Sequence, residues 1–317
     1  MLSPSLFLAL GIVLLIGGAN WLVSGASSLA NRYNVSNLTI GLTIVAFGTS
    51  SPELIVNVIA SLQGHQDILL GNIIGSNNFN LFFILGLAGL ITPLAVHSNT
   101  VWREIPISLF AAILLFILGN GFFSDAPTSL SRLDGVLLLF CFAGFMYYVF
   151  LELKTVSEEK TSTNKHSPIW KSSAKVISGL AGLIIGGNLV MQNAITIASE
   201  LGVSEKVIGL TIVAAGTSLP ELATTVIAAI KKNIDLAVGN VIGSNIFNIF
   251  FILATSVTIH PIAFDPSFNM DLILLMVGTL LLFIAMFTGV KKKLERWEAF
   301  ILLMLFIAYT FYMITQT

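Results

Sequence analysis

Charged residues are scarce in this chain. Asp, Glu, Lys and Arg make up 10% of its 317 residues, whereas a soluble globular chain carries about 25%. Hydrophobic residues make up 56%, and the mean hydropathy is +0.93. This composition excludes a soluble enzyme, and the chain has neither a basic surface nor a polybasic tail for nucleic acid. It predicts a polytopic membrane protein whose environment is the lipid bilayer.

Cysteine is also nearly absent. The single Cys141 lies in an apolar segment, which excludes an intramolecular disulfide and disfavours metal–thiolate chemistry. We interpret it as a small core residue. The first apolar stretch, from Leu6 to Leu29, lacks the charged start of a secretory signal, so it predicts a spanning helix.

Ten apolar windows of about 20 residues follow one another along the chain. We expect each to be a transmembrane helix, which makes the fold class all-α. The windows are 5–30, 37–62, 68–92, 104–123, 133–151, 174–199, 205–230, 236–259, 269–289 and 296–315. The polar segment 152–175 separates two sets of five and predicts a cytoplasmic linker.

The two halves repeat one another. LTIGLTIVAFGTSSPE, residues 38–53, returns as KVIGLTIVAAGTSLPE, residues 206–221. The segment 69–85 returns as 237–253, and each residue of the second copy is numbered 168 higher (221 against 53). A repeat this dense predicts a duplicated unit. We divide the chain into a first repeat at 1–151 with its motif at 38–85, and a second repeat at 176–317 with its motif at 206–253.

Lys and Arg are distributed unevenly between alternate loops. Thirteen lie in loops after odd-numbered helices, and only Arg132 and Lys206 lie on the opposite side. The positive-inside rule then places both termini outside the cytoplasm. Because five helices per repeat is an odd number, the second repeat is expected to be inverted in the membrane. Inverted repeats are typical of secondary transporters, whose substrate site lies near the midplane.

The repeated motif combines a helix break with an acid. Pro52 removes one helical hydrogen bond and crowds Gly48, so we expect free backbone carbonyls near residues 46–49 and 214–217. Residues spaced i, i+3, i+4 and i+7 share one helix face. These faces present Ala46, Thr49, Ser50 and Glu53 in the first copy, and Ala214, Thr217, Ser218 and Glu221 in the second. Hydroxyls, carbonyls and carboxylates form an oxygen cage suited to Na⁺ or Ca²⁺.

A second polar stripe follows in each half. It comprises Asn72, Ser76 and Asn80 in the first half, and Asn240, Ser244 and Asn248 in the second. Together the stripes would surround a cavity of formal charge −2, which one Ca²⁺ or two Na⁺ neutralise. Competition for one cage is the basis of antiport. A serine in a membrane helix can instead simply bond its own backbone, but a central carboxylate costs about 2.5–3.5 kcal/mol and indicates a cation or proton ligand. Gly17, Gly18, Gly186 and Gly187 predict close packing of the first and sixth helices.

The paired GTSxPE and GNxxGSNxFN motifs resemble the alpha repeats of the sodium/calcium exchangers in the cation/calcium antiporter superfamily. Nearly the whole chain is similar to their compact prokaryotic members. The resemblance implies four central cation positions in a cell (inner) membrane protein that works by alternating access, with no obligatory protein partner. It implies that Glu53 and Glu221 serve both ions. Thr49, Thr217, Ala46 and Ala214 would supply carbonyl oxygens, and Ser50, Ser218, Ser76 and Ser244 would serve the Na⁺ positions.

Asn80 and Asn248 depart from some relatives, which have an acid at one of these places. Two asparagines disfavour K⁺ co-transport, and the Thr-Ser-x-Pro-Glu segment favours sodium over proton coupling. We therefore expect electrogenic, K⁺-independent exchange of Na⁺ for Ca²⁺, with these ions as cargo and no other cofactor. A Ca²⁺/H⁺ antiporter is the alternative. A channel suits a carboxylate trap less well, and a hydrolase would need a Ser–His or paired-Asp centre that the sequence lacks, so no enzyme activity is expected.

Overall fold

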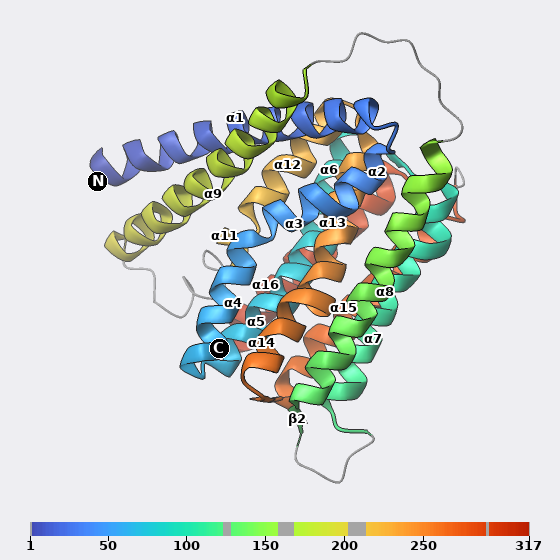
Figure 1. The fold of residues 1–317 in the computed structure, drawn as a ribbon. Coiled ribbons are helices and arrows are strands. Elements are labelled where there is room, and N and C mark those ends of the chain that lie inside the picture. The colour runs from blue at the N-terminus through green and yellow to red at the C-terminus, as the bar shows by residue number, and fades with distance from the viewer. Residues whose placement is uncertain (1, 123–127, 158–167, 202–213, 290–291, 317) are drawn as a thin grey trace.

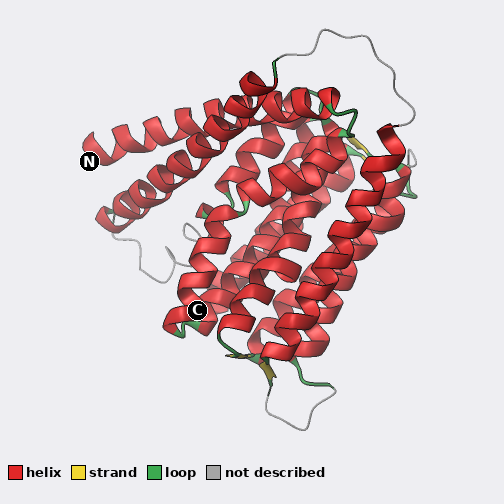
Figure 2. Ribbon diagram, in the orientation of Figure 1, coloured by secondary structure: helices red, strands yellow, loops and turns green. Residues whose placement is uncertain are grey.

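Helices make up nearly all of the ordered secondary structure (Figure 2). The computed structural model describes residues 2–122, 128–157, 168–201, 214–289 and 292–316. The α-helices are α1 (Leu2–Arg32), α2 (Asn37–Ile40), α3 (Ala46–Thr49), α4 (Ser51–Gln63), α5 (Gln66–Asn78), α6 (Leu85–Ile91), α7 (Ile105–Gly119), α8 (Arg132–Ser157), α9 (Ile169–Glu200), α11 (Ala214–Gly216), α12 (Leu219–Ile230), α13 (Ile234–Phe247), α14 (Ala254–Ile259), α15 (Asn269–Ala285) and α16 (Arg296–Gln316). A short 3₁₀ turn, η6 (Pro266–Phe268), precedes α15.

Four π-helical turns interrupt the long helices in the described part of the chain. They are η1 (Gly41–Val45), η2 (Phe79–Ile84), η3 (Thr100–Glu104) and η5 (Asn248–Leu253). The turns η2 and η5 occupy nearly equivalent places in the two halves, immediately after the GSN segments. π-helical turns inside α-helices occur frequently at functional sites, and these two contain Asn80 and Asn248, the last residues of the second predicted polar stripe.

Eight helices of the described residues are long and apolar enough to cross a membrane, and the bent segment Asn37–Gln63 makes a ninth. The predicted helix 205–230 is described only from Ala214 onward, so this count does not reach the ten that we predicted. The polar linker is shorter than predicted, because α8 continues to Ser157 and α9 already begins at Ile169. Residues 158–167 lie outside the described part of the chain.

The all-α prediction missed two small antiparallel strand pairs. Strand β1 (Leu94–Ala95) pairs with β4 (Lys293–Leu294), and β2 (Ser129–Leu130) pairs with β3 (Ile262–Ala263). Each pair joins a loop of the first half to a loop of the second half. The two-residue strands therefore tie the halves together at the ends of the helical bundle.

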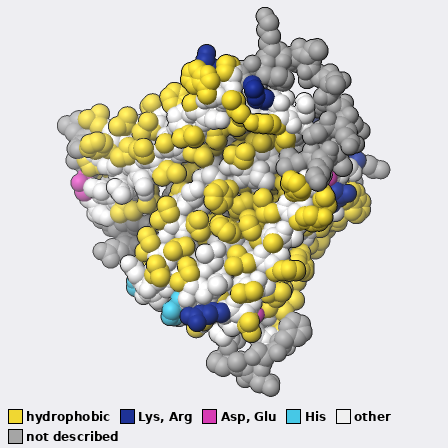
Figure 3. Space-filling model, in the orientation of Figure 1, with side chains coloured by type: hydrophobic (Ala, Val, Ile, Leu, Met, Phe, Trp, Pro, Cys, Tyr) yellow, Lys and Arg dark blue, Asp and Glu magenta, His cyan; other side chains and the backbone are white. Residues whose placement is uncertain are grey.

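The spans α5–η2–α6 and α13–η5–α14 form the centre of the molecule. In Ile234–Ile259, 94% of the apolar window is buried, and in Gln66–Ile91 78%, against 39% or less in the other six straight spans of the described residues. The outer helices expose large apolar side chains such as Leu133 and Phe140. Apolar side chains are spread over the whole face in Figure 3, and basic side chains lie only along its edges. This arrangement is that of a helical bundle solvated by lipid.

Helices α1 and α9 lie side by side at an angle to the other long helices (Figure 1). Their contact is a glycine seam. A Cβ at Gly18 would lie 2.8 Å from the carbonyl oxygen of Gly179, and one at Gly186 would lie 2.8 Å from that of Gly11. The predicted close packing is confirmed at Gly18 and Gly186. A Cβ at Gly17 would have no heavy atom within 4 Å, so that glycine lies outside the seam.

Candidate cation-binding site

The break in the first GTSxPE motif occurs at Ser50. Helix α3 ends at Thr49 and α4 begins at Ser51, with a bend of 48° between Asn37–Thr49 and Ser51–Gln63. Pro52 occupies the first turn of α4, where the missing N–H costs no helical hydrogen bond. The second motif breaks in the same way, since α11 ends at Gly216 and α12 begins at Leu219. The predicted helix breaks are therefore confirmed.

Both broken segments pack against α9. A Cβ at Gly48 would lie 2.5 Å from Leu180 Cδ2, and one at Gly216 would lie 2.7 Å from the side chain of Met191. A side chain at either glycine would therefore require Leu180 or Met191 of α9 to shift. Helix α9 therefore contacts the broken segment of each half.

The carbonyl of Ala46 keeps its helical partner. It accepts the N–H of Ser50 at 3.0 Å. The prediction that the break frees this carbonyl is therefore wrong, because the helical bonding continues to Ser50. Ala214, its counterpart, is the first described residue of α11.

The two glutamates lie at the centre of a reciprocal set of hydrogen bonds. Glu53 and Glu221 are both fully buried. The hydroxyl of Ser218 donates to Glu53 Oε1 at 3.0 Å, and the hydroxyl of Ser50 donates to Glu221 Oε1 at 2.7 Å. Each carboxylate is therefore held by a serine from the other half of the chain.

The two threonines also make hydrogen bonds that cross from one half of the chain to the other. Thr49 Oγ1 donates to Asn240 Oδ1 at 3.1 Å, and Thr217 Oγ1 donates to Asn72 Oδ1 at 3.0 Å. These contacts are reciprocal, since each threonine of one motif bonds an asparagine of the other half. The hydroxyls of both threonines are thus engaged in joining the halves.

Ser244 and Ser76 differ in their contacts. Ser244 Oγ lies 3.0 Å from Ser50 Oγ and 3.4 Å from Glu221 Oε1. The buried Ser76 Oγ has no hydrogen-bond partner among the described residues. The second stripe therefore reaches the carboxylates on the α13 side.

Two buried asparagines beside the second stripe were missed by the sequence analysis. Asn77 Oδ1 accepts the amide of Asn248 at 2.9 Å, and Asn245 Oδ1 accepts the amide of Asn80 at 3.1 Å. Asn77 and Asn245 also donate to each other's backbone carbonyls, both at 3.3 Å. They stand one residue away from the i, i+4 stripe. Their recurrence at the repeat offset, inside an apolar helix, is the sequence signal that could have identified them.

The surroundings of the two carboxylates are not identical. Asn57 Nδ2 donates to the carbonyl oxygen of Glu53 at 2.7 Å. Thr225 stands at the equivalent place beside Glu221, and its hydroxyl accepts the amide of Asn240 at 3.0 Å. The first half thus carries a carboxamide one turn beyond its glutamate, where the second half carries a hydroxyl.

Several buried side-chain oxygens on these helices have no hydrogen-bond donor among the described residues. Among the predicted ligands they are Glu53 Oε2, Glu221 Oε2, Ser76 Oγ, Asn80 Oδ1 and Asn248 Oδ1, and Asn57 Oδ1 and Asn78 Oδ1 share this property. A buried polar atom left unsatisfied costs about 1–3 kcal/mol. No Lys or Arg is buried in the described part of the chain. Carboxylate, hydroxyl and carboxamide oxygens are ligands of hard cations such as Ca²⁺, so the arrangement can bind a cation between the halves.

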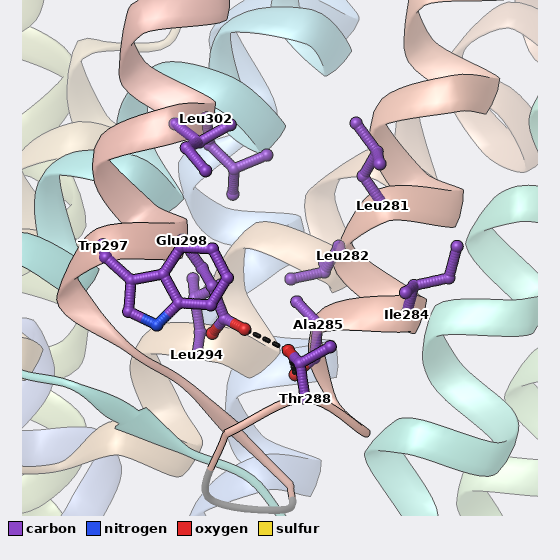
Figure 4. A pocket seen from close by; sticks show the side chains of 10 residues that line it. Leu281, Leu282, Ile284, Ala285, Thr288, Leu294, Trp297, Glu298 and Leu302 are labelled. Atoms are coloured by element: carbon purple, nitrogen blue, oxygen red, sulfur yellow. Dashed lines mark hydrogen bonds between the residues drawn. The ribbon is translucent and has the colours of Figure 1, made fainter.

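A pocket that contains a carboxylate lies between α15 and α16 (Figure 4). Its other lining residues are mostly apolar, and they include Leu282, Leu302 and Trp297. Both oxygens of Glu298 are used there, since Oε1 accepts from Thr288 and Oε2 accepts the N–H of Glu295 at 2.8 Å. That carboxylate caps the start of α16 and offers no free oxygen to a cation.

Comparison with known proteins gives a consistent result. The family described as sodium/calcium exchanger protein matches residues 3–151 and 172–315. The chain is 40% identical to a putative antiporter CaxA of Alkalimonas amylolytica, over 98% of both chains. It is 32% identical to the sodium/calcium exchanger MaX1 of Methanosarcina acetivorans, over 96% of both. A solved structure of the sodium-calcium exchanger NCX_Mj, soaked with 10 mM Na⁺ and zero Ca²⁺, superposes with a TM-score of 0.83 at 34% identity, covering 96% of this chain and 97% of the other.

Proposed function

The chain belongs to the sodium/calcium exchanger protein family, and we propose that it is a secondary active antiporter that exchanges Na⁺ for Ca²⁺ across the membrane. The observation that carries this proposal is the pair of buried carboxylates, Glu53 and Glu221. Each is held by a serine of the other half and each retains one free oxygen. One Ca²⁺ or two Na⁺ neutralise the pair, so binding of either ion weakens binding of the other.

The proposed ligands are the residues that the family resemblance implies. They are Glu53, Glu221, Thr49, Thr217, Ser50, Ser218, Ser76, Ser244, Asn80, Asn248, Ala46 and Ala214. The free oxygens of both glutamates, of Ser76 and of the two asparagines support this set. Ala46 would bind with the second lone pair of a carbonyl oxygen that is already hydrogen-bonded.

Transport would proceed by alternating access between two inverted five-helix repeats, ten helices in all, with both termini outside the cytoplasm. The reciprocal hydrogen bonds between the halves support the repeat. Helices α1 and α9 would move together against the core. Their glycine seam supports such a movement, because it lets the two backbones pack as one unit.

The coupling is proposed to be to Na⁺, electrogenic and independent of K⁺. The carboxamides of Asn80 and Asn248 add oxygens without a third negative charge, which disfavours a site for K⁺. The family resemblance implies three Na⁺ per Ca²⁺. Such a cycle moves one net charge, worth about 2.3 kcal/mol per 100 mV, so an inside-negative potential would drive Ca²⁺ out.

The test is radioactive Ca²⁺ uptake into proteoliposomes that contain the purified protein and are loaded with Na⁺. We expect uptake when the external medium holds no Na⁺, and stronger uptake when valinomycin and K⁺ make the interior positive. Equal uptake by vesicles loaded with choline would refute Na⁺ coupling, and insensitivity to the imposed potential would refute electrogenic exchange.

A Ca²⁺/H⁺ antiporter is the second candidate, because the same buried carboxylates can carry protons. It predicts uptake driven by a pH gradient without Na⁺ and abolished by a protonophore. We propose no enzyme activity, no organic cofactor and no obligatory protein partner.

A further inference from the structure

Four buried asparagines form a closed group where the two halves meet. Asn77 and Asn245 stand near the ends of α5 and α13, and Asn80 and Asn248 stand three residues further along each helix. All four are at most 3% exposed. Every hydrogen bond within this group crosses from one half to the other.

The orientation of each carboxamide follows from a backbone carbonyl. A carbonyl oxygen can only accept, so the atom of Asn77 that faces the carbonyl of Asn245 is the amide nitrogen. The side-chain oxygen of Asn77 is then the atom that faces Asn248, and Asn248 must present its own amide nitrogen. The side-chain oxygen of Asn248 is left without a donor among the residues that the structure describes.

The same sequence of contacts runs in the other direction. Asn245 donates to the carbonyl of Asn77, its oxygen accepts the amide of Asn80, and the oxygen of Asn80 has no donor. Asn80 follows Ser76, and Asn248 follows Ser244, by four residues. Both free oxygens therefore lie on the helix faces that carry these serines, and of the two serines Ser244 lies 3.4 Å from Glu221 Oε1.

We propose that Asn77 and Asn245 are positioning residues that present the side-chain oxygens of Asn248 and Asn80 to the transported cation. This inference rests on the proposed function. A carboxamide can turn by 180° and offer either oxygen or N–H₂ to the site. Only the oxygen can ligate a cation, and the bonds from Asn77 and Asn245 hold the amide nitrogens away from it. Neither positioning residue touches the ion.

A merely structural role predicts something different. If Asn77 and Asn245 only joined α5 to α13, their removal would lower stability and would affect all ligands alike. If they act through their partners, Asn77 is coupled to Asn248 and not to Asn80. The two roles are separated by double-mutant cycles.

The experiment measures equilibrium binding of radioactive Ca²⁺ to the full chain in detergent, with thermal unfolding recorded for every variant. We expect Asn248→Ala and Asn77→Ala each to weaken binding about tenfold, as loss of an orienting partner commonly does. The double variant Asn77→Ala/Asn248→Ala is expected to remain near tenfold. Asn77→Ala/Asn80→Ala is expected to multiply the two losses to about a hundredfold.

Asn78 supplies the matched control. It is a fully buried neighbour of the same type that donates to the carbonyl of Asp271 at 3.0 Å and has no hydrogen bond to the four asparagines. Asn78→Ala should leave Ca²⁺ affinity unchanged. The mirrored cycle of Asn245→Ala with Asn80→Ala decides the question if Asn77→Ala does not fold.

Multiplicative losses in both matched pairs would overturn the positioning role while leaving the proposed function intact. Absence of Ca²⁺ binding by the unmutated protein would instead refute the proposed function, and the positioning role with it.

Discussion

Replacing Glu53 by Gln removes one charge from the site and almost nothing else. Glu53 Oε1 accepts from Ser218 at 3.0 Å, and the side-chain oxygen of glutamine can accept the same bond. The glutamine N–H₂ then takes the place of Oε2, which has no donor to lose. The variant therefore keeps volume and hydrogen bonding, so its effect on ions is electrostatic.

The magnitude follows from the charge of the bound ion. Two unit charges about 4 Å apart interact by about 4 kcal/mol at an effective dielectric constant of 20, and a divalent ion doubles this to about 8 kcal/mol. These values are upper limits, because the amide dipole restores part of the interaction. The ratio of the two losses does not depend on the dielectric constant. We expect the fold-loss in Ca²⁺ affinity to be about the square of the fold-loss in Na⁺ affinity.

The assay is equilibrium binding of radioactive Ca²⁺ and Na⁺ to purified Glu53→Gln and Glu221→Gln. Glu298→Gln is the control, since it neutralises a buried carboxylate outside the site and should leave both affinities unchanged. Equal fold-losses for the two ions would show that the carboxylate charge is not what binds them, and would refute the electrostatic reasoning.

Two further predictions concern the scaffold. Gly18→Ala places a Cβ 2.8 Å from the carbonyl oxygen of Gly179, so it should lower the free energy of unfolding by about 1–3 kcal/mol and slow ion exchange. Gly17→Ala is the control and should do neither. Thermal unfolding and Ca²⁺ flux are measured for both variants, and equal effects would contradict a seam at Gly18. Tyr148→Phe removes the hydroxyl that donates to the buried Glu104 and should lower the free energy of unfolding by about 1–3 kcal/mol. The KM for Ca²⁺ should stay unchanged. A raised KM would contradict a purely structural role for the Tyr148–Glu104 hydrogen bond.

The helices and the broken segments could be predicted because their causes are local. Apolar length predicts a span, and Pro52 and Pro220 predict a break. Most predicted helix boundaries fall within a few residues of those observed. The larger error is at the linker, where α8 and α9 extend by about one or two turns into a polar sequence. Composition predicts which residues are solvated, and a helix can continue into water.

The partners of the site residues could not be predicted, because they depend on how the halves meet. Helical spacing places Thr49, Ser50 and Glu53 on one face, but it does not reveal that Ser50 serves Glu221. The roles of Asn77 and Asn245 were missed for the same reason, since their contacts cross the two-fold. The carbonyl of Ala46 was wrongly expected to be free, because the proline affects a bond nearer the break.

The exchange of serines between the halves has a consequence for synthesis of the chain. Ser218 follows Glu53 by 165 residues, which at 5–20 residues per second takes roughly 8–33 s. Throughout that interval the ribosome has delivered the first carboxylate to the bilayer without its donor. Glu221 has its donor from the start, because Ser50 has already been synthesised when Glu221 is added to the chain. Two carboxylates that each have a serine donor from the other half in the finished protein are therefore unequal during insertion, and the first half alone must tolerate an incomplete site.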